Sequence, residues 1–140
     1  MTQNEIFHIG EQALEAQSFS KLLGTNLLEF TTGEVVLEVP ITEHVLQQHG
    51  FVHGGVISYA ADNALTFVGG SVLGPNVLTA EYKINYVRPA IGEKIIARAT
   101  VISAGKRQAV CRCDVFAVKD GEEKICATAQ GTIMTVVSEQ

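Results

Sequence analysis

The sequence predicts an α+β fold in which a long antiparallel β-sheet wraps around one central α-helix. Three observations indicate this fold. Residues 54–68 lack strand-like alternation and are apolar around most of a helix circumference, which is typical of a buried helix. Two strand-like segments precede this helix and four follow it. The chain also lacks the regular alternation of strands and helices that a parallel doubly wound sheet requires.

The chain is predicted to form a single domain over residues 1–140, because this length suits one hydrophobic core. Residues 1–20 are expected to form an N-terminal helical extension. Within it, residues 3–17 carry a modest amphipathic helix, and Gly10 weakens its apolar stripe. The extension is expected to cover a sheet edge or the entrance to a ligand site.

The strands are predicted from alternating polarity and from turn residues. The first two cover residues 27–31 and 34–40, and the second shows the alternation of a half-buried strand. The later strands are predicted near residues 77–87, 93–103, 108–119 and 122–137. Pro89–Gly92 predicts a turn after the first of these later strands, and Asp120–Gly121 predicts a hairpin before the last. The central helix is expected to stop at Gly69–Gly70.

Composition and charge exclude several classes of function. The chain is 46% hydrophobic, and we expect some of this apolar surface to be buried between subunits. The net charge of −5 argues against a general nucleic-acid-binding protein, which needs a basic face. No apolar run has membrane-spanning length, and no basic start precedes an apolar signal core. The expectation is a cytoplasmic protein with no membrane partner.

Cysteine and histidine positions do not predict a metal site. Cys111 and Cys113 share one face of a strand, and we interpret the cysteines as small buried apolar side chains. His49 and His53 have the i, i+4 spacing of a helical ligand pair, but the glycines around them oppose a helix there. No neighbouring Cys or Glu completes a ligand set, so no metal is expected.

The segment around Gly54 and Gly55 predicts a binding site for negative charge. The first N–H groups of a helix have no partner within the helix, and the helix dipole favours negative charge there. Such a helix start can hold an anion or a developing oxyanion. A tight turn that needs the flexibility of glycine is the alternative.

Asp62 is the second unusual feature, because it lies on the same apolar helix. An ionised carboxylate in a dry core is costly, so it needs a partner, water or a function. A catalytic carboxylate and a structural acceptor for a neighbouring strand are both possible. Thr66, one turn later, could orient a water molecule or simply pack. Gln47, before the helix, could hydrogen-bond a substrate carbonyl or remain solvated.

Helix geometry separates the two unusual features. Gly54 and Asp62 are eight residues apart, or roughly 12 Å along a helix axis at about 1.5 Å per residue. A base must lie within about 3 Å of its proton or act through one water. If both residues act on one carbonyl, they must come from different subunits. Two helices antiparallel across a two-fold axis would then form two identical sites.

These residues together resemble a known family. The motif reads Gln47-x5-His53-Gly54-Gly55-x6-Asp62-x-Ala64, followed by Asn85-Tyr86-Val87-Arg88-Pro89-Ala90-x-Gly92-Glu93. It is similar to that of the hotdog-fold acyl-CoA thioesterases of the phenylacetate-degradation type. The similarity runs from about Leu22 to Val136, which is most of the chain.

The resemblance implies the roles of several residues in thioester hydrolysis. The Gly54 N–H polarises the thioester carbonyl, and Asp62 of the other subunit acts as nucleophile or general base. Gln47 aligns the carbonyl or the water, and His53 shapes the loop. A hydroxyl on Thr66 or on Thr79 assists, and which of the two serves stays open. The enzyme is expected to be a homodimer, with a dimer of dimers as the larger assembly.

The resemblance also implies a substrate that carries coenzyme A, with no separate cofactor. Basic residues should then line the entrance for its phosphates, and the candidates are Arg88, Lys106 and Arg107, each of which could instead be a solvated charge. Gly55, Thr79 and Tyr82 are further substrate-contacting candidates. The aromatic side chains of the region, which also include Phe51, Tyr59 and Phe67, fit an aryl or a medium-chain acyl group.

Two other functions remain open. A hotdog-fold hydratase or dehydratase would act on acyl thioesters without hydrolysing them, but such relatives pair His with an acid at a different spacing. A non-catalytic acyl-CoA-binding module would keep the pocket without needing Asp62.

Overall fold

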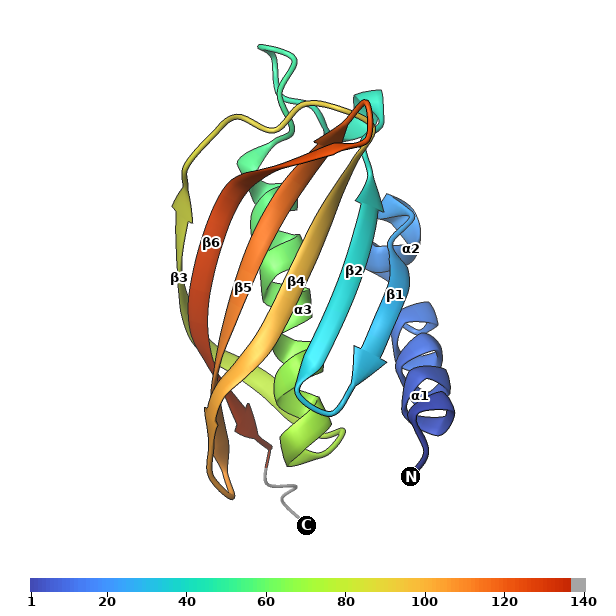
Figure 1. Cartoon of the computed structure of the whole chain (residues 1–140), viewed down its shortest axis with the longest axis vertical. Helices are drawn as coiled ribbons and strands as arrows, with labels where there is room; N and C mark the ends of the chain where they lie inside the picture. The colour runs from blue at the N-terminus through green and yellow to red at the C-terminus, as the bar shows by residue number, and fades with distance from the viewer. Residues whose placement is uncertain (137–140) are drawn as a thin grey trace.

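In the computed structural model, which describes residues 1–136, six strands form one antiparallel sheet in the order β1-β2-β4-β5-β6-β3. The sheet curls around α3, and α1 and α2 lie beyond β1 (Figure 1). The strands are β1 (Asn26–Thr31), β2 (Glu34–Pro40), β3 (Val77–Tyr86), β4 (Lys94–Ala104), β5 (Gln108–Lys119) and β6 (Glu122–Thr135). The helices are α1 (Gln3–Glu15), α2 (Ser18–Leu23), the short 3-10 helix η1 (Glu43–Val45) and α3 (Gly54–Leu73). The predicted fold class is confirmed.

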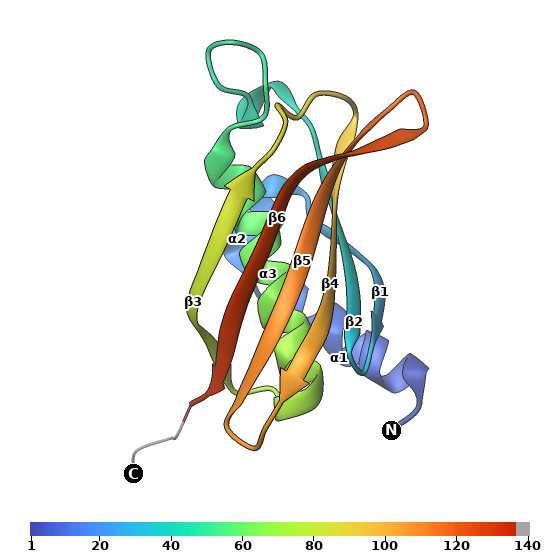
Figure 2. The same cartoon turned by 60° about the vertical axis from the view of Figure 1, so that its left-hand side comes forward.

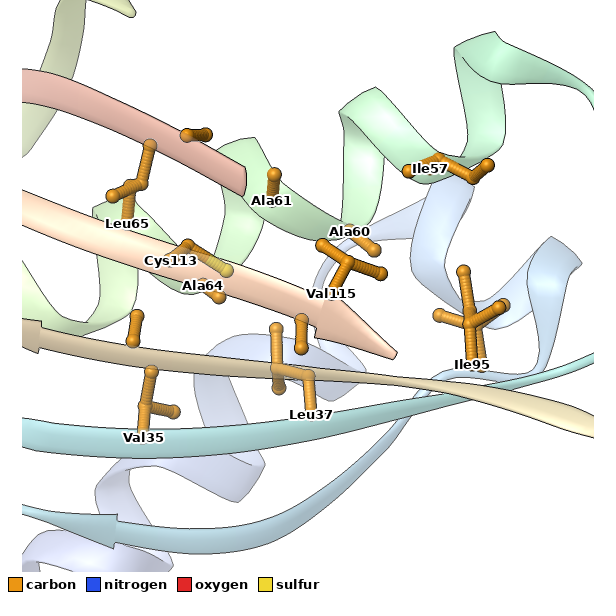
Figure 3. Close-up of a cluster of buried hydrophobic side chains, with 14 of the residues drawn as sticks. Val35, Leu37, Ile57, Ala60, Ala61, Ala64, Leu65, Ile95, Cys113 and Val115 are labelled. Atoms are coloured by element: carbon orange, nitrogen blue, oxygen red, sulfur yellow. The ribbon is translucent and has the colours of Figure 1, made fainter. Parts of the chain in front are cut away.

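The core lies between α3 and the concave face of the sheet. Alanines on α3 let the helix approach the strands closely, and Ala60, Ala61 and Ala64 are completely buried. Figure 3 shows them packed with side chains of β2, β4 and β5, including Leu37 and Val115. Although α3 is apolar, no helix within residues 1–136 is long and apolar enough to cross a membrane.

The predicted end of the central helix at Gly69–Gly70 is wrong, because α3 continues to Leu73. A Cβ atom at Gly69 would lie 2.6 Å from Cβ of Ile133 on β6. This glycine therefore serves close packing of helix on strand, which local sequence does not reveal. The helix ends instead at Gly74, whose φ of 106° suits glycine.

The two predicted turns have different outcomes. The Asp120–Gly121 hairpin is confirmed, since both residues have positive φ between β5 and β6. The Pro89–Gly92 segment does not join neighbouring strands. It carries the chain from β3, which pairs with β6, to β4, which lies between β2 and β5 (Figure 2). The connection is thus a crossover rather than a turn, and strand order depends on contacts remote in sequence.

The N-terminal segment packs against the edge strand β1. Thr2 caps α1 by accepting a hydrogen bond from the Glu5 N–H at 3.1 Å. Gly10 is buried against β1, where a Cβ would lie only 2.5 Å from the Phe30 ring, so glycine allows the close approach. Gly10 is therefore a close-contact residue in addition to a weak helix former. The second helix, α2, was not predicted; it is six residues long and ends at Gly24 in the left-handed conformation.

The strand β3 contains a bulge at Ala80. Thr79 pairs with Ile133 and Glu81 pairs with Thr132, so Ala80 is an extra residue. Thr79 and Tyr82 both have hydrogen-bond partners on α3, although they are three residues apart. Strict alternation would have pointed them to opposite faces.

Replacing Gly131 with alanine is expected to destabilise the fold by about 1–3 kcal/mol, the usual cost of overpacking. A Cβ at Gly131 would lie 2.6 Å from both the Glu81 carbonyl oxygen and the Tyr82 Cβ, beside the bulge. Urea unfolding measures the effect. Gly105→Ala is the control, because a Cβ there meets nothing closer than 3.8 Å. Equal unfolding midpoints for the two variants would contradict the prediction.

The three cysteines are buried and unpaired, as the sequence predicted. Burial raises the pKa of Cys111 from 9.0 to about 11. It raises the pKa of Cys126 to about 11 as well. Burial, with the neighbouring Asp114 charge, raises the pKa of Cys113 further. The thiols are therefore neutral and poorly nucleophilic at neutral pH.

Alkaline pH is expected to lower the free energy of unfolding. A thiol whose pKa is higher in the folded than in the unfolded protein stabilises the fold while it stays protonated. This contribution is complete below the unfolded pKa of 9.0 and is lost as pH rises through the folded pKa of about 11. Urea unfolding across this range tests the expectation. Cys126→Ala should make the decline shallower, and an identical decline in this variant would contradict the assignment.

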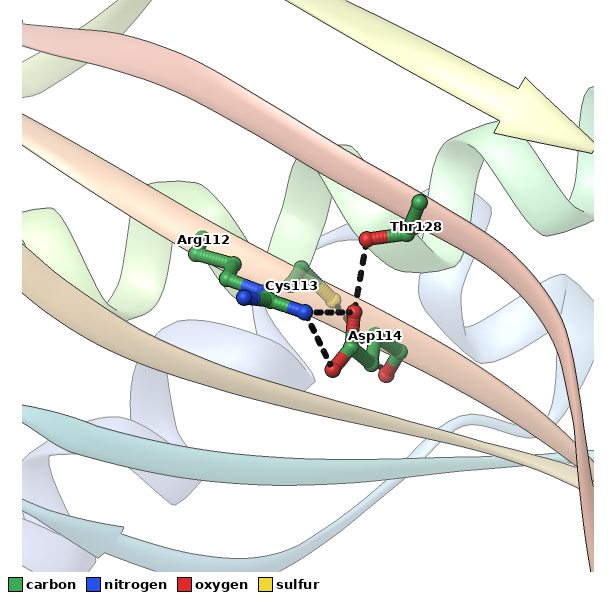
Figure 4. Close-up of polar contacts among 4 residues, drawn as sticks. All are labelled: Arg112, Cys113, Asp114 and Thr128. Carbon is green, nitrogen blue, oxygen red and sulfur yellow. Dashed lines mark hydrogen bonds and ion pairs between the residues drawn. The ribbon is translucent and has the colours of Figure 1, made fainter.

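The outer face of the sheet carries polar side chains as well as a small apolar cluster of Val36, Ile96, Val118 and Phe116. Asp114 on β5 accepts a hydrogen bond from the Thr128 hydroxyl at 2.7 Å and forms an ion pair with Arg112 at 3.3 Å (Figure 4). These side chains lie on the face away from α3, whereas Cys113 points into the core. Asp114 is thus a structural acid, useful for comparison with Asp62.

Candidate active site

Asp62 lies on α3 beside β3 and is half-buried. The Thr79 hydroxyl donates a hydrogen bond to Asp62 Oδ1 at 2.7 Å. Thr66 Oγ1 lies 2.8 Å from Thr79 Oγ1 and donates to the Asp62 carbonyl oxygen at 2.8 Å. Within residues 1–136, Asp62 Oδ2 has no hydrogen-bond partner. This oxygen is not buried, so solvent reaches it. One carboxylate oxygen is therefore held and the other can bind water or substrate.

A row of polar contacts joins α3 to β3 on this side of the sheet. Ser58 Oγ lies 2.5 Å from Tyr82 OH, one turn before Asp62. One further turn back, Tyr86 OH donates to the Gly54 carbonyl oxygen at 3.2 Å. The helix residues recur every four positions, which keeps them on one face. Neither Ser58 nor Tyr86 was predicted as a site residue, although the four-residue spacing before Asp62 points to Ser58.

The start of α3 leaves one N–H available. His53 is the N-cap residue, and its Nδ1 accepts the Gly55 N–H at 2.8 Å. Its carbonyl oxygen accepts from Val56 at 2.9 Å. Among residues 1–136, no acceptor pairs with the Gly54 N–H. The geometry fits Gly54 as the donor to a ligand and His53 as the residue that shapes the turn. The Gly55 N–H is already engaged, which leaves Gly55 no free amide for substrate.

Gln47 lies in the loop that precedes α3. Its Oε1 accepts a hydrogen bond from the His49 N–H, and its own N–H donates to the Phe51 carbonyl oxygen at 2.8 Å. The loop is attached to the helix start, since the His53 N–H donates to Val45 at 2.8 Å. This loop therefore lies at the Gly54 end of α3 (Figure 1), and the Gln47 side-chain oxygen orders it.

Gly54 and Asp62 do not come together within one protomer. They lie on one continuous helix, eight residues apart, which corresponds to roughly 12 Å along the axis. This separation is the one from which a site shared between subunits was predicted.

The basic candidates lie at opposite ends of the protomer. Arg88 follows β3 at the end where α3 begins, and its N–H donates to Cys126 at 3.3 Å. Lys106 and Arg107 occupy the β4–β5 turn at the other end, where Arg107 accepts from the Thr135 N–H at 2.9 Å. All three side chains are exposed. One protomer alone does not gather them into a single patch.

Besides Tyr82, two of the aromatic candidates have structural contacts. Tyr59 OH lies 2.6 Å from Ser20 Oγ and 2.7 Å from Thr25 Oγ1, which ties α3 to the segment around α2. Phe67 packs edge-on against Phe30 with ring centroids 5.4 Å apart. Within residues 1–136, no three His, Cys, Asp or Glu side chains gather into a metal-binding group.

Comparison with known proteins identifies the family. The family model of the Thioesterase superfamily matches residues 49–124, which include the His53–Gly55 turn and Asp62. The chain belongs to the thioesterase superfamily. A thioesterase family protein from Silicibacter pomeroyi is 32% identical, with a TM-score of 0.87 over 91% of this chain and 95% of its own. A relative from Deinococcus radiodurans that carries an esterase name is 32% identical, covering 85% of this chain and 80% of its own.

Two solved structures named for phenylacetic acid degradation extend the comparison. A mutant form of PaaI from Thermus thermophilus is 29% identical with a TM-score of 0.75, covering 86% of this chain and all of its own. PaaI of Escherichia coli has a TM-score of 0.85 over 98% of this chain and 97% of its own, but only 21% identity, so it supports the fold alone. The chain is a hotdog-fold thioesterase, and its hydrolase class follows from the family.

Proposed function

We propose that this thioesterase hydrolyses an aryl or medium-chain acyl-CoA, with Asp62 of one subunit and the Gly54 N–H of the other acting on one thioester. The observation that carries the proposal is the free N–H at the start of α3, together with a carboxylate on the same helix that has one oxygen hydrogen-bonded and the other free. Neither group alone completes a hydrolytic site, and roughly 12 Å of helix separates them. We expect a cytoplasmic enzyme without a cofactor beyond the coenzyme A of its substrate.

The free edge of β3 supports a dimer that completes the site. β3 ends the sheet, and Leu78 is 64% exposed on it, with Val87 55% exposed just after it. An exposed edge strand readily pairs with another copy. In an antiparallel β3–β3 pair, the start of one β3 lies beside the end of the other. The Lys106–Arg107 turn of one subunit would then approach Gly54 and Arg88 of the other, where the phosphates of coenzyme A need positive charge.

The chemistry follows from these positions. As attack on the thioester begins, negative charge develops on the carbonyl oxygen, and the fixed Gly54 N–H stabilises it. Asp62 Oδ2 either removes a proton from the attacking water or attacks the carbonyl carbon itself, forming an anhydride that water then cleaves. Thr79 holds the other carboxylate oxygen in both routes. The carbon–sulfur bond breaks, and the thiolate leaves as coenzyme A.

The sharing of the site between subunits is tested with two inactive chains. Asp62→Asn and Gly54→Pro subunits are mixed after partial unfolding, or are produced together with different tags. A shared site predicts that each hybrid dimer contains one intact site, which restores about a quarter of native activity in a random mixture.

A site within one chain predicts no recovery, because every subunit then carries a defect. Thiol release from a panel of acyl-CoAs measures the activity of the native chain and of the mixtures. Mixing Asp62→Asn with itself is the control for refolding. Activity in the hybrid no higher than in this control would overturn the shared site.

A further inference from the structure

A cavity of about 630 Å³ lies between α1, α3 and the turn that joins β1 to β2. Two helices form facing walls of the cavity, and the lining residues have the same spacing along both helices. Its α1 wall consists of Ile6, Ile9, Gly10 and Ala13, and its α3 wall begins with Asn63, Thr66, Phe67 and Gly70. Both sets follow the i, i+3, i+4, i+7 pattern of a single helix face. The volume is within the range of pockets that bind small molecules.

The cavity begins beside the proposed catalytic acid. Asn63 is the chain neighbour of Asp62, and Thr66 both lines the cavity and contacts Thr79 at 2.8 Å. Thr79 in turn donates to the Asp62 carboxylate at 2.7 Å. A thioester carbonyl placed at Asp62 could therefore extend its acyl group past Thr66 into the cavity.

The lining limits the class of ligand. None of the side chains that line the cavity is ionisable, so it suits neither phosphate nor carboxylate. On α3 and its C-terminal cap the lining runs from Asn63 to Gly74, roughly 16 Å along the helix at about 1.5 Å per residue. This length exceeds that of one aromatic ring and suits an extended alkyl chain.

We propose that this cavity binds the unbranched aliphatic chain of the acyl substrate, with α1 as its outer wall. The proposal rests on the proposed thioesterase function and narrows its substrate to medium-chain acyl groups. Two residues that line the cavity are joined to each other, since Asn63 Nδ2 donates a hydrogen bond to Gln17 Oε1 at 3.1 Å. Ile9 lines the cavity from α1 and is 45% exposed, so its apolar side chain is accessible to an alkyl chain bound there.

The test uses thioether analogues of acyl-CoA, which cannot be hydrolysed, so that binding is measured without catalysis. Calorimetry compares decyl-CoA with ethyl-CoA on the full chain. The native protein is expected to bind decyl-CoA at least ten-fold more tightly. Ala13→Phe fills the cavity from α1 and should remove most of this difference. Gln12→Phe, on the same helix but outside the lining, should keep it.

The outcomes separate the cavity from the catalytic proposal. A decyl preference that is unchanged in Ala13→Phe, or absent in the native protein, would overturn the cavity assignment even if thioesters are hydrolysed. A decyl preference that Ala13→Phe removes supports the cavity even if no thioester is cleaved. If Ala13→Phe does not fold, Ile9→Ala enlarges the cavity and should shift the preference towards dodecyl-CoA. An unshifted preference would then count against it.

Discussion

Asp62→Asn is expected to lower kcat/KM for acyl-CoA hydrolysis by about 10²–10⁴-fold, the usual contribution of a positioned acid or base. Asparagine has the shape of aspartate and its oxygen can still accept from Thr79. It can neither take a proton from water nor attack a carbonyl carbon as a carboxylate does. The measurement is thiol release, with thermal unfolding to establish that the variant folds.

Asp114→Asn provides a matched control. Asp114 also accepts a hydrogen bond from a threonine at 2.7 Å, but it lies on the outer face of the sheet (Figure 4). Its replacement removes a partly buried acid without touching the proposed site, so activity should stay near the native value. Native-like turnover in Asp62→Asn would exclude Asp62 as the catalytic carboxylate.

Gly54→Pro is expected to lower kcat by about 10²–10³-fold, the cost of losing one oxyanion donor. Proline lacks the N–H, but it suits the first position of a helix, where no helical hydrogen bond is lost. The preceding residue, His53, has φ −58° and ψ 133°, the extended conformation that proline requires. The substitution therefore removes one donor while the start of α3 is retained.

Gly54→Ala is the companion variant, since it adds a Cβ but keeps the N–H. The new Cβ would lie 3.6 Å from the Tyr86 ring, an ordinary contact, so activity should remain within a few-fold of native. If both variants are equally impaired, the effect is steric and the donor role fails. If neither is impaired, another group stabilises the oxyanion.

The elements that the sequence predicted well are those whose signal is local. The apolar surface of α3 and the alternation in β2 arise from burial, and Val35, Leu37 and Val39 are buried as expected. The end of α3 was misplaced because Gly69 serves close packing against Ile133, which lies 64 residues later in the chain. The β3–β4 crossover was missed for the same reason, since strand order is a property of remote pairs.

The residues of the candidate site also differ in whether local sequence or remote contacts reveal them. Gly54 and Asp62 stand out in the sequence because each residue type is unusual in its local setting. The partner of the carboxylate was left open between Thr66 and Thr79, and the structure gives Thr79 the contact with Oδ1. The bulge lies between Thr79 and Tyr82, which both contact α3, and no residue type marks Ala80 as its position.

The bulge at Ala80 gives β3 an uneven tolerance to changes in chain length. Removing Ala80 would leave Thr79 and Glu81 opposite consecutive residues of β6, so the pairing would become regular and Tyr82 would still face α3. Removing a residue such as Lys83 would shift every later side chain by one position and turn Ile84 and Tyr86 towards the opposite face. Natural deletions in this strand should therefore concentrate at a single residue.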